Sequence, residues 1–234
     1  MGEAAARKAA EIFQKVIQSK KKVCFVAATG ASQFEFLKAL CQHNEIDWKK
    51  TEMFHLDEYI GLSENHPASF RYYLKKRIVD KVKPGKVFFI QGDASNPNYE
   101  CKRISALISR RIIDVAFVGI GENGHLAFND PPADFKTIEP YIVVNLDVKC
   151  RKQQLNEGWF KSIEEVPKKA ITMSINEIMR AKNIICTCPD KRKAEAVRNC
   201  LSDKAKISPN YPASILKNHP RAMCYLDKSS SSLL

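Results

Sequence analysis

Short runs of apolar residues alternate along the chain with segments whose apolar residues recur at helical spacing. Residues 23–28 (VCFVAA) form a continuous apolar run, and residues 32–40 (SQFEFLKAL) follow it with apolar positions three or four residues apart. The first pattern is typical of a buried strand and the second of an amphipathic helix, for which Ser32 would be a favourable N-cap residue. These residues therefore predict a strand, a tight loop and a helix.

The same unit recurs through the rest of the chain. Strands are predicted over residues 51–56, 87–90, 113–120, 183–188 and 222–227, and helices over residues 68–79, 99–109 and 191–201. Apolar strands that alternate with helices indicate a parallel sheet covered on both faces. No Gly- or Pro-rich linker and no internal repeat divides the sequence. We therefore predict a single α/β domain over residues 1–234, with a Rossmann-like, mostly parallel sheet and helices on both faces.

The N-terminal segment and the cysteines indicate a cytoplasmic protein. Residues 1–20 mix charged and apolar residues as an amphipathic helix does, and they lack the apolar core of a signal peptide. No segment has the roughly 20 apolar residues that a membrane-spanning helix needs. The eight cysteines are scattered and include no CxxC pair, as expected of reduced thiols in the cytoplasm.

The formal charge of +12 favours an anionic binding partner. Such a charge is compatible with binding to nucleic acid or to an anionic small molecule. The lysines are spread along the chain without interleaved aromatic residues, so most of them are expected on solvated helix faces. We therefore expect no nucleic acid and no membrane among the partners, and a phosphorylated small molecule as the substrate.

Three loops at predicted strand ends carry candidate chemistry, because open parallel sheets bind ligands beyond the carboxyl ends of their strands. Residues 28–32 (ATGAS) are small enough to let backbone N–H groups approach a phosphate at the start of a helix, although a plain turn has the same composition. Asp57 and Glu58 follow the strand over residues 51–56. They are either catalytic or simply cap the next element.

The third loop, residues 119–132 (GIGENGHLAFNDPP), follows the strand over residues 113–120. Its three glycines permit a tight, exposed backbone path around His125, and Asp130 lies five residues further on. A histidine near an acid at a strand's carboxyl end has the composition of a proton-transfer site.

These motifs together resemble a known family. LDEYIGL (56–62) and GIGENGHLAFNDP (119–131), preceded by ATGAS and followed by KAEAV (193–197), resemble the glucosamine-6-phosphate deaminase (isomerase) family. That family belongs with the 6-phosphogluconolactonases in one sugar-phosphate superfamily. The resemblance covers residues 22–227 and implies conversion of glucosamine 6-phosphate and water to fructose 6-phosphate and ammonia, with no cofactor and no metal.

The resemblance also implies catalytic roles. Asp57 matches the family's base, which moves a proton between C2 and C1, and His125 matches the histidine that opens the sugar ring. Glu58 is expected to support the site as a hydrogen-bond partner or cap. Asp130 stands where the family usually has Glu, and it is expected to orient His125. Asn123 stands where some members have Asp, so more of that orienting task falls on Asp130.

Phosphate binding is expected at the backbone of the ATGAS loop, with Lys193 as the matching cation. The family's phosphate arginine has no clear counterpart here, and Arg151 is the nearest candidate. The full set of residues predicted to bind substrate is Thr29, Gly30, Ala31, Ser32, Glu58, Gly121, Gly124, Arg151 and Lys193.

Residues 131–141 (PPADFKTIEPY) bear on regulation. Hexameric members bind a second amino-sugar phosphate through a Ser, an Arg and a Lys shortly after the loop that ends at Asp130, and this segment mostly lacks such side chains. We therefore expect an enzyme without that allosteric control, present as a monomer or a small homo-oligomer. Its substrate is a hexosamine 6-phosphate, and the sequence leaves the gluco or galacto epimer open.

Two alternatives remain. A 6-phosphogluconolactonase has the same fold, but its loop typically reads GxGxDGHxAS, whereas this chain has GHLAFNDP and keeps the LDEY acids. A non-catalytic sugar-phosphate sensor normally carries a DNA-binding helix-turn-helix, and only about 20 residues precede the first predicted strand. The deaminase interpretation accounts for more of the motifs than either alternative.

Overall fold

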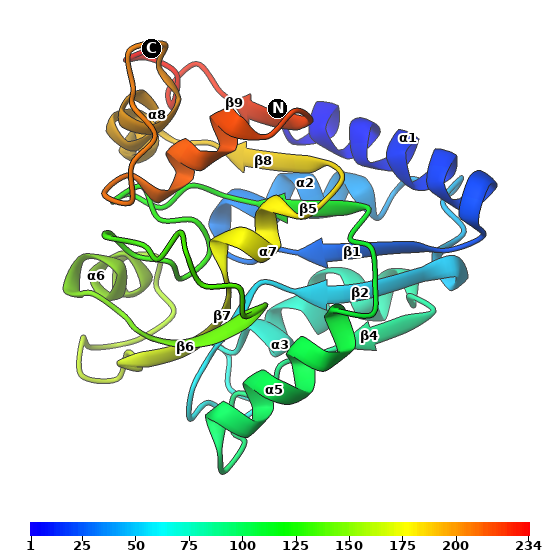
Figure 1. Ribbon diagram of the computed structural model, residues 1–234, viewed down its shortest axis with the longest axis horizontal. Coiled ribbons are helices and arrows are strands. Elements are labelled where there is room, and N and C mark those ends of the chain that lie inside the picture. Colours follow the sequence, from blue (N-terminus) through cyan, green and yellow to red (C-terminus); the bar gives the residue numbers. More distant parts are fainter.

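A six-stranded parallel sheet forms the centre of the computed structural model, which describes residues 1–234 (Figure 1). Every neighbouring pair of strands in this sheet is parallel. From one edge to the other the strands are β4 (Lys86–Phe88), β2 (Thr51–His55), β1 (Val23–Ala27), β5 (Val115–Val118), β8 (Ile184–Cys188) and β9 (Ala222–Leu226). The three central strands are buried along their whole length, which explains their continuous apolar sequences.

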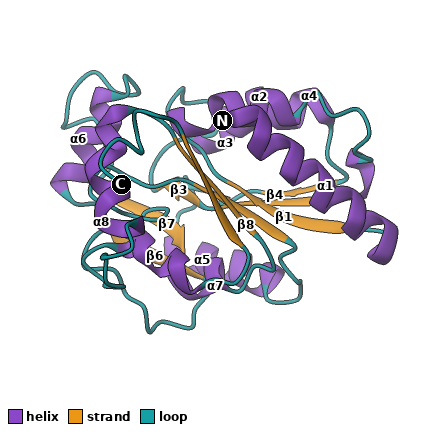
Figure 2. Ribbon diagram, turned by 90° about the horizontal axis from the view of Figure 1, so that it is seen from above, coloured by secondary structure: helices purple, strands orange, loops and turns teal.

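Helices cover both faces of this sheet (Figure 2). On one face lie α1 (Gly2–Lys20) and α2 (Phe34–Leu40), and on the other lie α5 (Pro97–Ile108) and α7 (Ile175–Met179). The predicted α/β class, with a mostly parallel sheet between helical layers, is confirmed. No helix is both long and apolar enough to cross a membrane.

Several helix starts differ from the sequence prediction, including those of the helices predicted over residues 32–40 and 68–79. Ser32 is not the N-cap of α2, because it lies inside a 3₁₀ turn, Ala31–Gln33, that precedes the helix. The predicted helix over residues 68–79 begins two residues later than expected, at α3 (Phe70–Leu74), where the side chain of Ser69 accepts a hydrogen bond from the Tyr72 N–H.

The helix that begins with α3 continues through a π-helical turn, Lys75–Val79, into α4 (Asp80–Val82). The other helices are α6 (Val148–Asn156), α8 (Ala194–Leu201) and the 3₁₀ helices Trp48–Lys50, Lys191–Lys193 and Pro212–Asn218.

A second, antiparallel sheet was not predicted. It contains β3 (Asp57–Tyr59), β7 (Lys169–Met173) and β6 (Tyr141–Asn145), in that order. Leu56 joins the two sheets, since it follows β2, precedes β3, and its carbonyl accepts the Met173 N–H at 2.7 Å. The Asp57–Glu58 pair therefore does not merely end a strand but belongs to a strand of its own.

The order of the strands places a crevice between β1 and β5. From β1 the chain moves outward to β2 and β4, then returns across the sheet to β5 and continues outward to β8 and β9. Ligands bind beyond the carboxyl ends of the strands at such a reversal. The loops that follow β1 and β5 diverge there, and both carry predicted site residues.

Candidate active site

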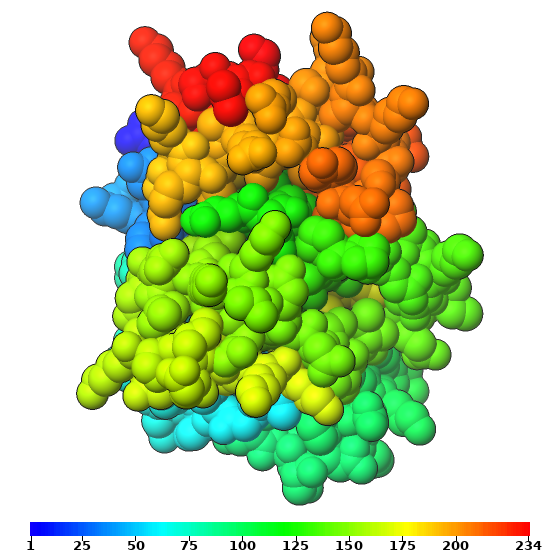
Figure 3. Space-filling model, turned by 90° about the vertical axis from the view of Figure 1, so that its left-hand side faces the viewer, coloured from blue at the N-terminus to red at the C-terminus, as the bar shows by residue number.

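A cavity of about 290 Å³ lies beyond the carboxyl ends of the parallel strands. Figure 3 views this end of the molecule, with the green loop after β5 between the yellow-green segment around α6 and the orange segment around α8. The predicted site residues that line the cavity are Thr29, Gly30, Ala31, Ser32, Asp57, Gly121, His125 and Lys193. Those that do not line it are Glu58, Asn123, Gly124, Asp130 and Arg151.

The loop over residues 29–32 is held in a conformation that leaves backbone N–H groups free to bind a ligand. The Tyr73 hydroxyl donates to the Gly30 carbonyl at 2.9 Å, whereas the N–H groups of Thr29 and Gly30 donate to no backbone carbonyl. Gly30 has φ 91°, a left-handed conformation that favours glycine. Unpaired N–H groups ahead of a helix are suited to binding an anion.

Gln33 fixes this loop to two strands of the parallel sheet. Its fully buried amide donates to the Val118 carbonyl at 3.2 Å and to the Thr187 hydroxyl at 2.8 Å. The same hydroxyl donates to the Ser32 carbonyl at 3.3 Å. The loop is therefore tied to the ends of β5 and β8 before any ligand binds.

Two cations reach the cavity from the loop that follows β8. Lys193, at the end of the 3₁₀ turn Lys191–Lys193, is buried against the cavity wall. Arg192 also lines the cavity, where its Nε and Nη2 donate to Asp190 Oδ2 at 3.1 and 3.0 Å. Its Nη1 lies 3.4 Å from Glu122 Oε1. Half of the Arg192 side chain is exposed, so it can reorient toward a ligand.

The structure does not bring Arg151 to the cavity. Its guanidinium donates instead to the carbonyls of Ile163 and Val166, in the segment between α6 and β7. Arg151 is therefore engaged in fixing that segment. Arg192 was missed by sequence reasoning although it adjoins Lys193, because the neighbouring lysine alone was matched to the family pattern.

Asp57 faces the cavity from β3 with only 6% of its surface exposed. Burial raises its pKa well above the ordinary value of 3.8, and the adjacent charge of Glu58 raises it further. The N–H of Phe128 opposes this increase only in part. A carboxyl with a raised pKa in a cavity can both take up and return a proton.

Glu58 points away from the cavity and fixes the start of α3. Its carboxylate accepts the N–H groups of Phe70 and Arg71 at 3.0 and 2.8 Å, and the Ser69 hydroxyl at 2.9 Å. Arg71 Nε lies 3.4 Å from the same carboxylate. Glu58 thus has the geometry of a helix cap and orients β3, which carries Asp57.

His125 packs directly against Gly121. A Cβ atom on Gly121 would lie 2.2 Å from His125 Nε2, so only glycine leaves room for the ring there. The backbone N–H of His125 donates to Asn123 Oδ1 at 3.1 Å, which fixes the backbone from which the imidazole extends. His125 is 8% exposed and lines the cavity.

Asp130 lies behind the imidazole, with Oδ1 3.2 Å from His125 Nδ1. The two atoms are close enough for an ion pair, but the ring nitrogen is not aligned for a regular hydrogen bond. Burial alone would raise the pKa of Asp130, yet contacts with His125, Asn123 and the Asp147 N–H lower it below its ordinary value.

Asn123 separates two carboxylates. Its Nδ2 donates to Asp130 Oδ1 at 3.0 Å and to Asp147 Oδ2 at 3.1 Å. An aspartate at position 123 would instead place a third negative charge there. The structure thus gives a physical reason for Asn123 beside the shorter Asp130.

Several residues that line the cavity were not predicted from the sequence. Gln153, Gln154 and Glu157 reach the cavity from α6 and its end, and Asp190 and Asp227 follow β8 and β9. The two aspartates could have been found, since Asp227 is the last residue of the strand predicted over residues 222–227 and Asp190 lies two residues after the strand predicted over residues 183–188. The α6 residues could not, because this short polar segment has no clear apolar periodicity.

The arrangement combines an anion-binding loop, two cations and two groups able to transfer protons, Asp57 and His125, around one cavity. Asp57 comes from the antiparallel sheet and His125 from the loop after β5. A phosphorylated substrate held by the loop and the cations would lie with its carbon skeleton between these two groups. Such a site can move protons between neighbouring atoms of an anionic metabolite.

Comparisons with known proteins agree with this chemistry. Residues 1–224 match the family described as glucosamine-6-phosphate isomerases/6-phosphogluconolactonase. The chain is 34% identical over 231 residues to a glucosamine-6-phosphate deaminase of Listeria monocytogenes serotype 4a (strain HCC23), covering 99% of this chain and 96% of that protein. It is 36% identical over 238 residues to the deaminase of Thermoanaerobacter pseudethanolicus, covering 99% and 92%.

Two solved structures show the same fold. A monomeric glucosamine-6-phosphate deaminase superposes with a TM-score of 0.89 at 34% identity, covering 100% of this chain and 97% of that one. A 6-phosphogluconolactonase from Thermotoga maritima superposes with a TM-score of 0.78 at 14% identity, covering 96% and 94%. The second likeness is one of fold alone.

Proposed function

This chain belongs to the family of glucosamine-6-phosphate isomerases and 6-phosphogluconolactonases, and on that premise we propose that it is a glucosamine-6-phosphate deaminase. It converts glucosamine 6-phosphate and water to fructose 6-phosphate and ammonia. The observation that carries the proposal is that Asp57 and His125 face one cavity together with an anion-binding loop. Full-length relatives named as deaminases support the same activity.

The phosphate group binds the loop over residues 29–32 and Lys193. We propose Arg192, in place of Arg151, as the guanidinium that completes this subsite, because Arg192 lines the cavity and Arg151 is engaged elsewhere. A guanidinium that leaves Asp190 for a phosphate exchanges one charge-assisted interaction for another.

Ring opening requires proton exchange with the ring oxygen. His125 is the group for this step, because it lines the cavity and an imidazole exchanges protons near neutral pH. Asp130, at 3.2 Å from Nδ1, stabilises the imidazolium while it holds the proton.

Asp57 then removes the proton from C2 of the open chain and returns it to C1 through an enolamine. The raised pKa of its carboxyl, caused first by burial, makes it a stronger base than an ordinary aspartate. Water adds at C2 of the resulting imine, and ammonia leaves. No cofactor takes part in this sequence of proton transfers.

The alternative on the same fold, hydrolysis of 6-phosphogluconolactone, gives no task to Asp57, since ester hydrolysis moves no proton between carbons. A non-catalytic sensor would need neither Asp57 nor the His125–Asp130 contact. The deaminase reaction thus assigns a role to more of these residues than either alternative does.

We also propose that the enzyme works as a monomer in the cytoplasm, without allosteric control. A relative of the same length described as monomeric supports the first point. The eight cysteines, all present as free thiols, fit a reducing compartment.

The test is ammonia release by the purified protein. Glucosamine 6-phosphate and galactosamine 6-phosphate are offered separately, and 6-phosphogluconolactone is offered in a parallel hydrolysis assay. We expect ammonia from an amino sugar, and the faster epimer identifies the substrate. Hydrolysis of the lactone alone would transfer the function to the alternative, and silence on all three, with sugar-phosphate binding retained, would indicate a sensor.

A further inference from the structure

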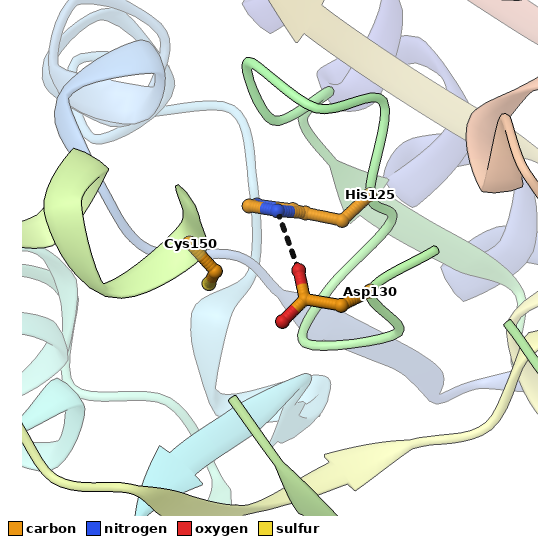
Figure 4. A group of neighbouring side chains, drawn as sticks. All are labelled: His125, Asp130 and Cys150. Atoms are coloured by element: carbon orange, nitrogen blue, oxygen red, sulfur yellow. Dashed lines mark ion pairs between the residues drawn. The ribbon is translucent and has the colours of Figure 1, made fainter. Parts of the chain in front are cut away.

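Three side chains of the types that bind zinc lie together beside the cavity: His125, Asp130 and Cys150. One ligand atom of each lies within 4.8 Å of the other two. Figure 4 shows the imidazole over the Asp130 carboxylate, with the Cys150 thiol of α6 beside both. Ligand atoms in a tetrahedral zinc site lie about 3.5 Å apart, so side-chain shifts of roughly 1 Å would complete the geometry.

His125 Nδ1 is buried without a hydrogen-bond partner of regular geometry. A buried ring nitrogen without a partner is uncommon in folded proteins. Asp130 Oδ1 lies 3.2 Å from Nδ1, but the two atoms are not aligned for a regular hydrogen bond. A cation bound to Nδ1 would give the ring nitrogen the partner that it lacks, and the neighbouring carboxylate could bind the same cation.

The surroundings of Cys150 are negative. Its thiol is 1% exposed, and burial, followed by the charges of Asp130 and Asp147, raises its pKa well above the usual value. The charge of Asp57 acts in the same direction. A potential that opposes a thiolate attracts a divalent cation, and a bound cation in turn stabilises the thiolate.

We propose that Zn²⁺ binds between His125 Nδ1, Asp130 and Cys150 and inhibits the enzyme. On binding, the thiol releases its proton to water, and the sulfur, the ring nitrogen and the carboxylate each donate a lone pair to the metal. Water from the cavity provides the fourth ligand, since His125 faces that cavity. With both groups bound to the metal, the imidazole can no longer exchange a proton with the ring oxygen of the sugar, and Asp130 can no longer stabilise the imidazolium. Inhibition rests on the proposed deaminase function, whereas metal binding does not.

Binding is tested without substrate, using Co²⁺ as a spectroscopic substitute for Zn²⁺. A thiolate bound to Co²⁺ gives a charge-transfer band in the near ultraviolet, and we expect this band in the native protein and its displacement by Zn²⁺. Cys150→Ser should abolish it, and Cys150→Ala should do the same if the serine variant folds poorly. Cys224→Ser is the control. Cys224 lies opposite Cys186 on the neighbouring strands β9 and β8, so these two free thiols are the other place where cobalt could bind.

Inhibition is tested by titrating Zn²⁺ into the deaminase assay, with each variant normalised to its own metal-free rate. We expect Cys150→Ser to raise the Zn²⁺ concentration for half-inhibition by about 10-fold or more, Cys224→Ser to leave it unchanged, and a chelator to restore the rate. Equal sensitivity of Cys150→Ser and native protein, or loss of the cobalt band in Cys224→Ser alone, would overturn the site. Should the protein lack deaminase activity, the cobalt spectrum still decides whether the site exists.

Discussion

Asp57 is a buried carboxyl group whose surroundings oppose its ionisation. Burial and the neighbouring Glu58 both raise its pKa, and the Phe128 N–H compensates only in part. A carboxyl with a raised pKa takes up a proton more readily than an ordinary aspartate and can still return it. The burial that destabilises the charged carboxylate in the folded protein is therefore also what suits Asp57 to the proposed proton transfer.

Replacing Asp57 by Asn should separate turnover from binding. The variant keeps the shape of the side chain but removes the base, so we expect kcat to fall by at least about 100-fold. The dissociation constant of a non-reacting sugar phosphate should change little. Steady-state kinetics and calorimetric binding provide the two values, and loss of binding with unchanged turnover would contradict this role.

The same variant should be more stable than the native protein at neutral pH. Because the pKa of Asp57 is higher in the folded state than the ordinary 3.8, folding is penalised as pH rises through the folded pKa and is not penalised below about 3.8. Urea unfolding at several pH values should thus show a gain for Asp57→Asn near pH 7 that disappears in acid. A gain that is independent of pH would show that the carboxyl charge is not its cause.

The acidic limb of the activity profile is a separate test. Asp57 acts only when ionised, so kcat/KM should fall at a pH clearly above that expected for an aspartate with an ordinary pKa of 3.8. A rate profile across the acid range, measured where the protein stays folded, determines the limb. A limb close to the ordinary value would rule out Asp57 as the controlling base.

The phosphate subsite predicts opposite outcomes for two arginines. Arg192→Ala should raise KM by about 10-fold with a smaller effect on kcat, because it removes one partly exposed charge from the phosphate. Arg151→Ala is the matched control, and it should leave KM unchanged. The reverse pattern would restore Arg151 as the phosphate ligand.

At the scale of elements, the loops after β1, β5 and β8 could be predicted from sequence, because continuous apolar strands reveal where their carboxyl ends lie. The antiparallel sheet could not. β3 is three residues long, too short to show periodicity, and it pairs with β7, which lies more than 100 residues further along the chain. Pairings of that kind depend on tertiary contacts and leave no local pattern in the sequence.

Glu58 tests how this sheet is joined to α3. In Glu58→Gln, an amide group replaces one acceptor oxygen opposite the N–H groups of Phe70 and Arg71, so one buried donor loses its partner. We expect the free energy of unfolding to fall by about 2 kcal/mol. Glu164→Gln, at an exposed position, is the control and should leave it nearly unchanged. Urea unfolding of both variants measures the difference, and equal stabilities would refute the capping role.

At the scale of the whole molecule, the cavity is formed by one chain. Every residue described in the site belongs to elements of the same fold, and the segment over residues 131–141 is engaged internally: Asp134 accepts the N–H groups of Lys136 and Thr137, and Asn176 donates to the Thr137 carbonyl. A cavity lined by residues of one chain supports the proposal that the enzyme works as a monomer.

We therefore expect hyperbolic kinetics that are independent of protein concentration. The rate per mole of enzyme should stay constant over a wide dilution range, and sedimentation should give the mass of one 26.5 kDa chain. A sigmoidal rate curve, or specific activity that falls on dilution, would show that subunits cooperate.

The two sheets also have a consequence for ancestry. The loops proposed to bind phosphate follow strands of the parallel sheet, whereas Asp57 lies on the antiparallel one, joined to it through Leu56. Substitutions on the short antiparallel strand can therefore change the proposed proton-transfer group without altering the loops proposed to bind phosphate. Because the two groups lie on different sheets, related proteins can keep phosphate binding unchanged while the reaction that they catalyse changes.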